Sequence, residues 1–414
     1  MSHPKKPWVI FGGNYGGFLE RFDTRTEQHL DVSVYPENSI GDAAKNLRER
    51  FQWTFPIVFS PHDSTTLYVT SQHVWKSTDE GMSWVRISDD LTRNDTTRLQ
   101  ASGGPITKDN TGVEVYCTIF TFAESPVKSG VLWAGSDDGR VHVSSDGGVH
   151  WKDVTPAALP EWSLVSIIEP SHFDAGTAYM AATRYKSGDE RPYLFRTTDF
   201  GTTWSAMTNG IPASAFTRVV REDPHRKGLL YCGTETGLYC SMDNGQSWQG
   251  LQFNLPVTPI HDIAVHAREK DLVVATHGRS FWILDDLTPL HQLADSIRRA
   301  PLSLLTPRPT YLIGNGSYVS KTMSEGTNAP SGVQLTYWLR DSVRGELTLE
   351  ILDQKDSVIR RFSNLKTDAG DDRKPNTETF ESVPERRSGS VLPTRTGMNR
   401  FTWDMNLKGV SKVN

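Results

Sequence analysis

The sequence predicts an all-β fold: a β-propeller of four-stranded blades followed by a β-sandwich module. Three observations lead to this prediction. An octet of the form Ser/Thr-x-Asp-x-Gly-x-x-Trp occurs four times, the segments around it repeat a pattern of four short strands, and the pattern changes after residue 290. Repeats of about 40 to 50 residues with four strands each are typical of propellers, in which each blade buries its faces against its neighbours.

Composition sets the first bounds on the class of protein. The 414 residues can bury a large core and hold roughly two or three domains. Hydrophobic residues at 36% and charged residues at 22% are typical of a soluble globular protein, and no apolar run approaches the ~20 residues of a membrane-spanning helix. A net charge of −5, with Lys and Arg scattered along the chain, provides no basic stripe for phosphates. We therefore expect no nucleic-acid partner and no membrane span.

Six repeat units fill residues 8 to 288. The first unit begins at its second strand, and its turn over residues 22–28 replaces the octet. The sixth, residues 260–286, lacks both the octet and a fourth strand. We expect either that the chain is part of a larger ring or that these two ends pair and close a six-bladed ring. If they do not pair, exposed strand edges predict self-association or pairing with further blades.

The octet is interpreted as part of the structural frame of the blades and not as a catalytic motif. Its Asp can accept hydrogen bonds from the amides of its own tight turn, and the Gly two residues later can take a positive φ. The Trp is expected to pack back beside the next strand and to fasten the blade at its outer turn. The residues assigned this structural role are Asp79, Trp84, Asp146, Trp151, Asp199, Trp204, Asp243 and Trp248.

The octet resembles the Asp-box, or bacterial neuraminidase repeat, of sialidases, xyloglucanases and sortilin-type propellers. Residues 8 to about 290 are similar to sortilin-like bacterial proteins often described as glycosyl hydrolases, and the stretches 102–120, 219–239 and 273–290 resemble that group in particular. The resemblance implies an exported multidomain protein, secreted, periplasmic or on the cell surface, although no signal peptide is recognisable at the start of the chain. Because the same box occurs in enzymes and receptors, it does not decide between them.

The sequence after the propeller predicts two further parts. Residues 291–309 indicate a short helical or irregular linker, with Pro301, Pro307 and Pro309 marking a boundary. Residues 310–414 alternate as strands and resemble the Ig-like or fibronectin-like sandwich modules at the ends of exported bacterial proteins, here with their last strands missing. The charged stretch 367–390 is interpreted as a flexible loop.

The three cysteines are too few for a disulfide scaffold and lack metal-site spacing. A three-residue loop, Glu235 to Gly237, would place Cys232 and Cys240 directly opposite each other on neighbouring strands. Packed thiols are favoured over a disulfide, because directly cross-strand disulfides tend to be strained. Neither a metal site nor a cofactor is expected.

Candidate site residues come from the face opposite the octets, where the second-to-third loops and the blade-to-blade crossovers gather. The longest crossover, residues 88–117, is the best single indication of a site, since loops beyond ~12 residues in compact repeats are usually functional or disordered. Glu114 and Glu235 are the catalytic candidates, with Asp109 a further acidic residue of this face. The ligand-binding candidates are Asn14, His73, Asp137, Arg140, Arg184, His277 and Arg279. Asp137 and Glu235 are equally good turn residues, and His277 could be a satisfied turn histidine.

Three functions remain open at this point. The first is a non-catalytic propeller that binds a polar ligand, glycan or peptide, on its loop face. The second is a glycoside hydrolase, which needs two suitably spaced carboxylates. The sialidase arginine set and a xyloglucanase aspartate motif are not recognisable in the sequence, which disfavours the enzyme without excluding it. The third is a structural scaffold, favoured if the loop face is narrow and neutral.

Overall fold

The computed structural model describes residues 1–37, 39, 41–101, 103, 115–311, 332–365 and 391–405. The chain divides into two compact units. The first consists of residues 1–267 and 273–283, and the second of residues 268–272 and 284–414. None of the helices in these ranges is long and apolar enough to cross a membrane.

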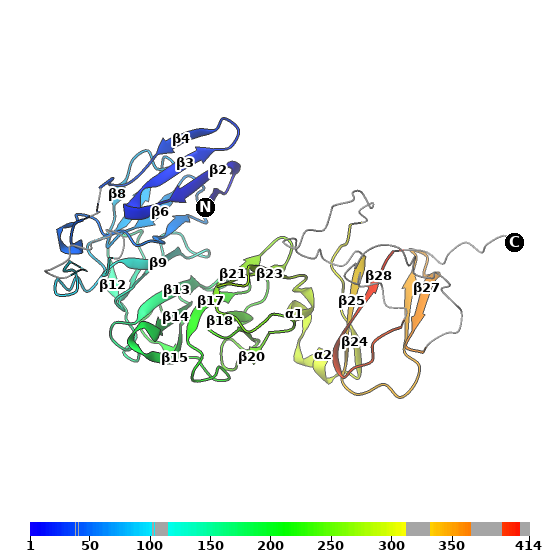
Figure 1. Ribbon diagram of the computed structural model, residues 1–414. Helices are drawn as coiled ribbons and strands as arrows, with labels where there is room; N and C mark the ends of the chain where they lie inside the picture. The colour runs from blue at the N-terminus through cyan, green and yellow to red at the C-terminus, as the bar shows by residue number, and fades with distance from the viewer. Residues whose placement is uncertain are drawn as a thin grey trace, which may run out of the picture. The chain divides into compact units, whose positions relative to one another are not determined.

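The described residues up to 284 form six antiparallel sheets that follow one another along the chain, from the blue N-terminal strands to the green ones in Figure 1. Five have four strands paired in chain order and the sixth has three. The strands of the first three sheets are β1 Ser2–His3, β2 Lys6–Gly13, β3 Leu19–Asp23, β4 Gln28–Asp31; β5 Ile57–Phe59, β6 Leu67–Thr70, β7 Val74–Ser77, β8 Val85–Arg86; β9 Ile119–Glu124, β10 Leu132–Ser136, β11 Val141–Ser144, β12 Lys152–Asp153. The others are β13 Leu164–Pro170, β14 Ala178–Arg184, β15 Asp189–Thr197, β16 Ser205–Ala206; β17 Thr217–Glu222, β18 Leu230–Thr234, β19 Leu238–Ser241, β20 Gln249–Gly250; β21 Ile260–His266, β22 Asp271–Thr276, β23 Phe281–Leu284.

The repeated four-stranded sheets confirm the predicted all-β propeller fold. One detail of the prediction was wrong: the first repeat does not begin at its second strand, because Ser2–His3 forms a short strand, β1, beside β2. Such a two-residue strand carries no alternating pattern that a sequence can show. The sixth sheet ends at its third strand. No sheet formed by the described residues combines strands of the first repeat with strands of the sixth repeat. The two ends therefore do not close a ring by pairing.

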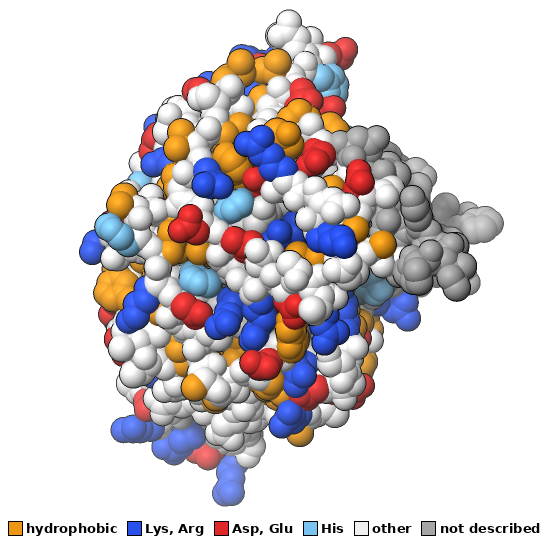
Figure 2. Space-filling view, turned by 90° about the vertical axis from the view of Figure 1, so that its left-hand side faces the viewer, with side chains coloured by type: hydrophobic (Ala, Val, Ile, Leu, Met, Phe, Trp, Pro, Cys, Tyr) orange, Lys and Arg blue, Asp and Glu red, His pale blue; other side chains and the backbone are white. Residues whose placement is uncertain are grey.

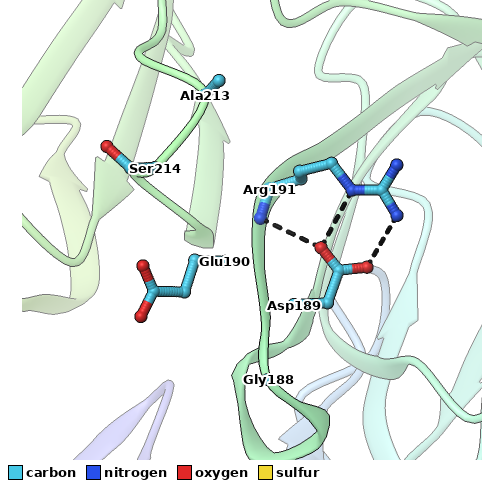
Figure 3. A pocket seen from close by; sticks show the side chains of 6 residues that line it. All are labelled: Gly188, Asp189, Glu190, Arg191, Ala213 and Ser214. Carbon is cyan, nitrogen blue, oxygen red and sulfur yellow. Dashed lines mark hydrogen bonds and ion pairs between the residues drawn. The ribbon is translucent and has the colours of Figure 1, made fainter.

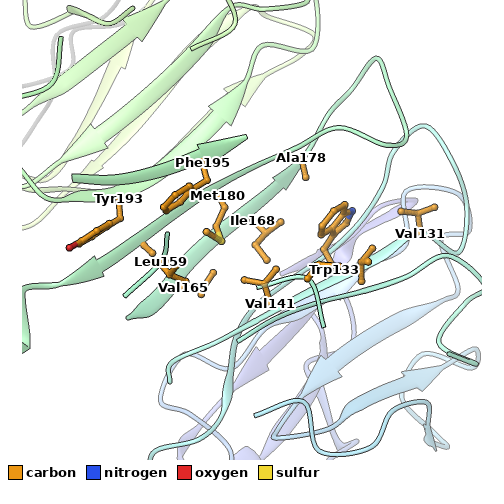
Figure 4. Packing of buried hydrophobic residues seen from close by; sticks show 13 residues of the cluster. Val131, Trp133, Val141, Leu159, Val165, Ile168, Ala178, Met180, Tyr193 and Phe195 are labelled. Carbon is orange, nitrogen blue, oxygen red and sulfur yellow. The ribbon is translucent and has the colours of Figure 1, made fainter. Parts of the chain in front are cut away.

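Consecutive sheets bury hydrophobic side chains between their faces. Figure 4 shows the cluster between the third and fourth sheets, where Trp133 and Val141 lie near Val165, Ile168 and Met180. Similar clusters join the first sheet to the second, the second to the third, and the fourth to the fifth. Each blade thus obtains its core from its neighbours, as a propeller requires.

The octets connect neighbouring sheets through one repeated contact. Each octet Trp donates its indole N–H to the carbonyl oxygen of the residue that directly follows the outer strand of the preceding sheet. We call these four acceptors the clamp residues. The pairs are Trp84 with Val32 (2.8 Å), Trp151 with Ile87 (2.8 Å), Trp204 with Val154 (2.8 Å) and Trp248 with Met207 (2.7 Å). The Trp therefore binds the preceding blade, a contact that the sequence-based expectation did not include.

The internal hydrogen bonds of the octet explain its composition. In residues 144–151, the amide of Gly148 donates to Ser144 Oγ (2.9 Å) and the amide of His150 donates to Asp146 Oδ1 (2.9 Å). Gly147 and Gly148 both have positive φ, 75° and 95°. The backbone and side-chain hydrogen bonds from His150 lower the pKa of Asp146 to about 2. The aspartate is thus held ionised inside its own turn, and the same contacts recur at Asp79, Asp199 and Asp243.

The described residues of the second unit form two short helices and two sheets. The elements are α1 Thr288–Gln292, α2 Asp295–Arg299, a sheet of β24 Leu302–Leu304, β25 Val333–Leu339 and β28 Gly397–Trp403, and a hairpin of β26 Thr348–Leu352 and β27 Val358–Ser363. Leu335, Tyr337 and Phe401 of this three-stranded sheet share a hydrophobic core with Leu349 and Phe362 of the hairpin. Residues 302–304 lie inside the predicted linker but belong to this sheet, and the predicted loop 367–390 lies outside the described residues.

All three cysteines are buried free thiols, as the sequence favoured. Their predicted register was wrong, because Cys232 faces Tyr239 and Tyr231 faces Cys240 across the β18–β19 pair. The loop between β18 and β19 has the expected three residues, 235–237, but hydrogen bonds between Thr234 and Gly237 close a tighter turn and shift the register by one residue. The two thiols consequently point to opposite faces of the sheet.

We predict that the clamp contact can be measured with two neighbouring glycines. A methyl group at Gly148 would lie 2.8 Å from Ile87 Cδ1, whereas one at Gly147 would meet nothing within 4 Å. Both have positive φ, so both Ala variants carry a similar backbone cost of about 1–2 kcal/mol. Gly148→Ala should lose about 1–3 kcal/mol more in urea unfolding, because the second sheet must move. Equal losses would show that the contact does not hold the sheets.

A second prediction concerns the indole. Trp204→Ala should lower the free energy of unfolding by about 3 kcal/mol, because the ring packs edge-on against Trp133 and donates to Val154. Trp204→Phe retains most of the packing and should lose about 1 kcal/mol. Thermal and urea unfolding measure both variants. Melting temperatures equal to that of the parent would contradict the role of the octet as frame.

Candidate functional site

A cavity of about 590 Å³ lies in the first unit where loops of the second, third and fourth sheets meet. We call it the loop-face cavity. Its walls come from the crossovers, which join the outer strand of one sheet to the inner strand of the next, and from second-to-third loops. The lining residues are Gln52, Trp53, Thr54, Val115, Tyr116, Phe120, Asp137, Trp162, Leu164, Thr183, Arg184, Tyr185, Lys186 and Ser187. These are the two kinds of loop that the sequence analysis selected.

Two exposed aromatic rings of the cavity are each supported by a second ring. Trp53, 48% exposed, packs on Tyr15 with ring centroids 4.8 Å apart. Tyr185, 38% exposed, stacks on Phe216 at 4.8 Å and 8° between planes. Both rings are therefore held in place before any ligand arrives, which reduces the entropy lost on binding.

Trp162 forms a more rigid part of the wall. Its ring stacks with Tyr116 (5.8 Å, 22°), and the guanidinium groups of Arg93 and Arg98 lie 5.0 and 5.2 Å from its centre. Trp162 has a φ of 62°, an uncommon conformation for a bulky residue. The β10–β11 turn approaches it so closely that a methyl group at Gly139 would lie 3.1 Å from the amide nitrogen of Ser163. Backbone strain of this kind is found preferentially at binding and active sites.

Asp137 is the carboxyl group of the cavity. It is 2% exposed and accepts hydrogen bonds from the Thr118 amide (2.9 Å), the Thr118 hydroxyl (2.7 Å) and the Gln52 side chain (3.3 Å). Burial raises its pKa to about 7, and the neighbouring charge of Asp138 adds to the rise, while the hydrogen bonds oppose it. Below neutral pH this carboxyl therefore carries a proton.

Arg184 and Lys186 bring positive charge to the same cavity. The nearest acid of Arg184 is Asp189, 3.5 Å from its NH1 nitrogen. Asp189 already binds Arg191 through Nε (2.9 Å) and NH2 (2.8 Å), as Figure 3 shows. The Nε atom of Arg184 is buried without a hydrogen-bond partner among the described residues. Arg184 is thus only weakly neutralised.

A second hollow of about 700 Å³ lies beside Asp189 and Arg191, and is lined also by Gly188, Glu190, Ala213 and Ser214 (Figure 3). It is wide open to solvent. The hydrogen bonds from Arg191 lower the pKa of Asp189, so its charge is already committed within the loop. The loop-face cavity is the better candidate site.

A polar cluster continues from Tyr185 toward the fifth and sixth sheets. The guanidinium of Arg218 lies 5.2 Å from the Tyr185 ring and donates twice to Glu235 Oε2, at 2.9 and 2.6 Å. The His277 ring stacks on His261 at 4.9 Å and 15°. Burial, with contributions from Arg218 and His277, lowers the pKa of His261. Glu235 is therefore engaged by an arginine, which does not favour a role as proton donor.

The structure brings together some predicted site residues and separates others. Asp137 and Arg184 line one cavity, and Glu235 and His277 lie in the cluster next to it. The side chain of Arg140 instead reaches Asp153 on the outer strand β12, at 3.0 Å. Glu114 and Asp109 lie outside the described residues.

Three other predicted residues make local contacts. His73 pairs with the buried Glu49, with 3.1 Å between Nδ1 and Oε2. The Asn14 side chain accepts from the next amide, that of Tyr15, at 2.7 Å. Arg279 donates to the carbonyl of Gly278 at 3.1 Å. These contacts stabilise turns, and the assignment of the three residues to ligand binding stays a prediction.

The aromatic wall was missed by the sequence analysis, which searched the loops for polar side chains only. Trp53, Tyr116 and Trp162 all lie in crossovers, outside the repeating strand pattern. An aromatic residue in a polar crossover does not belong to the core of a blade. Its presence there was the sequence feature that could have indicated an aromatic binding wall. Charges around the molecule are mixed: on the face in Figure 2, Lys and Arg side chains are interspersed with Asp and Glu. No described group of three or more His, Cys, Asp or Glu side chains could hold a metal ion.

No family model and no curated protein matches this chain. Among solved structures, an ancestral GH74 enzyme is 16% identical over 79% of this chain and 39% of its own, with a TM-score of 0.43. The GH74 xyloglucanase from Xanthomonas campestris is 15% identical over 69% of this chain and 51% of its own, with a TM-score of 0.38. YCF48 bound to D1 peptide is 10% identical over 68% of this chain and 94% of its own, with a TM-score of 0.33. None of these likenesses decides the function of this chain.

The proton on Asp137 leads to a prediction about pH. The unfolded Asp loses its proton near pH 3.8, whereas the folded one keeps it to about pH 7. Between these values the folded state binds the extra proton, so this residue makes stability fall as pH rises. The melting temperature of Asp137→Asn relative to the parent should therefore increase from about pH 4 to about pH 7 and then level off.

Asp146→Asn is the matched control. The pKa of Asp146 is lowered to about 2 in the folded state and the unfolded group titrates near pH 3.8, so both titrations are complete by about pH 5 and the difference from the parent should stay constant above that pH. Calorimetric scans across the range measure both variants. Parallel curves for Asp137→Asn and the parent would contradict a proton on Asp137.

Proposed function

We propose that this chain is the propeller part of an exported, sortilin-like multidomain protein and that it binds a polar ligand, a glycan or a peptide, in the loop-face cavity. The observation that carries the proposal is the cavity itself: two supported aromatic rings, Trp53 and Tyr185, beside a buried carboxyl and an incompletely neutralised arginine. Ligand sites are typically concave, largely apolar surfaces with a few well-placed polar groups.

The sortilin-like assignment is supported by the octet repeats and by the stretches 219–239 and 273–290 that resemble that group. The two sheets of the second unit share one core, as an Ig-like module would. We infer export and a location outside the cytoplasm from this resemblance. A scaffold without a ligand would have no need for exposed, preoriented aromatic rings.

A glycoside hydrolase is the second candidate, and Asp137 is the observation that favours it. A buried carboxyl with a pKa of about 7 has the property of a general acid. The reaction also needs a second carboxylate, about 5–5.5 Å away for retention or 6.5–9.5 Å away for inversion. Among the described residues that line the cavity, Asp137 is the only acid. Release of reducing ends that Asp137→Asn abolishes would establish the enzyme over the binder.

The binding proposal predicts a loss of affinity on removal of either supported ring. Ligands are first found on glycan and peptide arrays and then measured by calorimetry. Trp53→Ala and Tyr185→Ala should each weaken binding by about 2 kcal/mol, roughly thirtyfold, and the chain should still fold because both rings lie at the surface and outside the cores between the sheets.

Phe173→Ala is the matched control. Phe173 is similarly exposed, at 37%, but lies in the β13–β14 turn, which shares the octet face. Its removal should leave affinity unchanged. If the two cavity variants bind as tightly as the parent, the ligand does not occupy the loop-face cavity.

A further inference from the structure

We propose that the ligand of the loop-face cavity is an acidic glycan, a chain of uronate sugars whose carboxylates pair with Arg184, Lys186 and Arg98 while the sugar rings lie on Trp53 and Tyr185. This inference rests on the proposed function and specifies the chemistry of its ligand. Three observations carry it: the excess of positive charge, the lack of an ionised acid among the described lining residues below neutral pH, and the position of the aromatic rings.

The cavity holds more positive charge than its described residues neutralise. Lys186 lines the cavity, and the Arg98 guanidinium lies 5.2 Å from the Trp162 ring of its wall. Both side chains are exposed, and neither forms an ion pair with any other described residue. Arg184 has only the 3.5 Å contact with Asp189, which Arg191 already neutralises. An anionic ligand would supply the missing partners, and arginine is well suited to carboxylates because its planar fork donates two hydrogen bonds at once.

No described acid of the cavity competes for these cations below neutral pH. Asp137 is the only carboxyl group in the described lining, and it is held by Thr118 and Gln52. Burial keeps it protonated up to about pH 7. The neighbouring Asp138 binds the amide of Arg93 (2.8 Å) and the hydroxyl of Ser136. A bound carboxylate would therefore meet attraction from the cations without strong repulsion from the walls.

The aromatic rings favour a sugar over a peptide. The C–H bonds on one face of a pyranose ring carry partial positive charge and pack against the negative face of an aromatic ring. A uronate has this face and its carboxylate on one rigid ring, which matches Tyr185 next to Arg184 and Lys186 in the same loop. An acidic peptide carries its carboxylates on flexible side chains and would lose more conformational entropy on binding. Trp53 lies in the crossover before the second sheet and Tyr185 in the β14–β15 loop of the fourth sheet. A chain of several sugars can therefore contact both rings.

The test compares ligands of equal length in which methyl esterification removes the negative charge. Oligomers of galacturonate, glucuronate and mannuronate are titrated into the full chain at pH 6, each beside its methyl-esterified counterpart of equal length. We expect at least one acid to bind roughly tenfold or more tightly than its ester, with an affinity that falls as salt is added. Arg184→Gln and Lys186→Gln should each weaken binding of that acid roughly tenfold and leave binding of the ester unchanged.

Arg140→Gln is the matched control, because Arg140 is a loop arginine whose side chain pairs with Asp153 away from the cavity. It should bind as the parent does. Equal affinity for acid and ester, or binding of a tetraglutamate peptide in place of every uronate, would overturn this inference and leave the proposed binding function standing. Failure to bind any array glycan or peptide would overturn both.

Discussion

The hydrogen bond from each octet indole to the clamp residue of the preceding sheet is the contact on which the rest of the first unit depends. It occurs at four successive junctions with almost the same length, 2.7 to 2.8 Å. At each junction the octet glycine also touches the clamp residue, so close that a methyl group would overlap it, as at Gly201 and Val154. A directional bond and a steric contact on the same residue define both the distance and the rotation between sheets, which hydrophobic packing alone does not.

The clamp also determines where the binding loops begin. A crossover starts at each clamp residue, because that residue follows the outer strand. The crossover from Val32 carries Trp53, the one from Ile87 carries Tyr116, and the one from Val154 carries Trp162. Met207 likewise begins the crossover that ends at Phe216, the ring beneath Tyr185. The crossover that carries each aromatic wall residue thus begins at a residue that an octet Trp holds in place. The octets themselves lie on the opposite face.

The sequence was sufficient for the frame because the frame repeats. Four octets with the same internal pattern of Ser or Thr, Asp, Gly and Trp, together with a repeated order of short strands and turns around them, identify the sheets without any knowledge of contacts. Features that occur once had no such support. The two-residue strand β1 and the register of Cys232 depend on individual turn geometries, since a register shift of one residue changes which side chains lie opposite each other.

The candidate site was partly predictable for the same reason. Loop positions followed from the repeat, so Asp137 and Arg184 were found, whereas the direction of a long side chain is set by tertiary contacts. Arg140 pairs with Asp153 on a neighbouring strand and Glu235 pairs with Arg218, and these partners are brought together only by the fold. The aromatic wall, which belongs to no repeated position, could be identified only from its surroundings.

Asp137 connects the frame with the site. Its hydrogen bonds join three segments that are far apart in the sequence. These are the crossover with Gln52, the start of the third sheet at Thr118, and the β10–β11 turn. A fully ionised carboxylate at 2% exposure would be costly, and the group avoids that cost by keeping its proton. The hydrogen bonds that join the loops favour the ionised form, but burial outweighs them, so the group keeps its proton and adds no negative charge to the cavity beside Arg184. Structural stability and attraction for an anionic ligand therefore favour the same protonation state, and neither requires the residue to take part in chemistry.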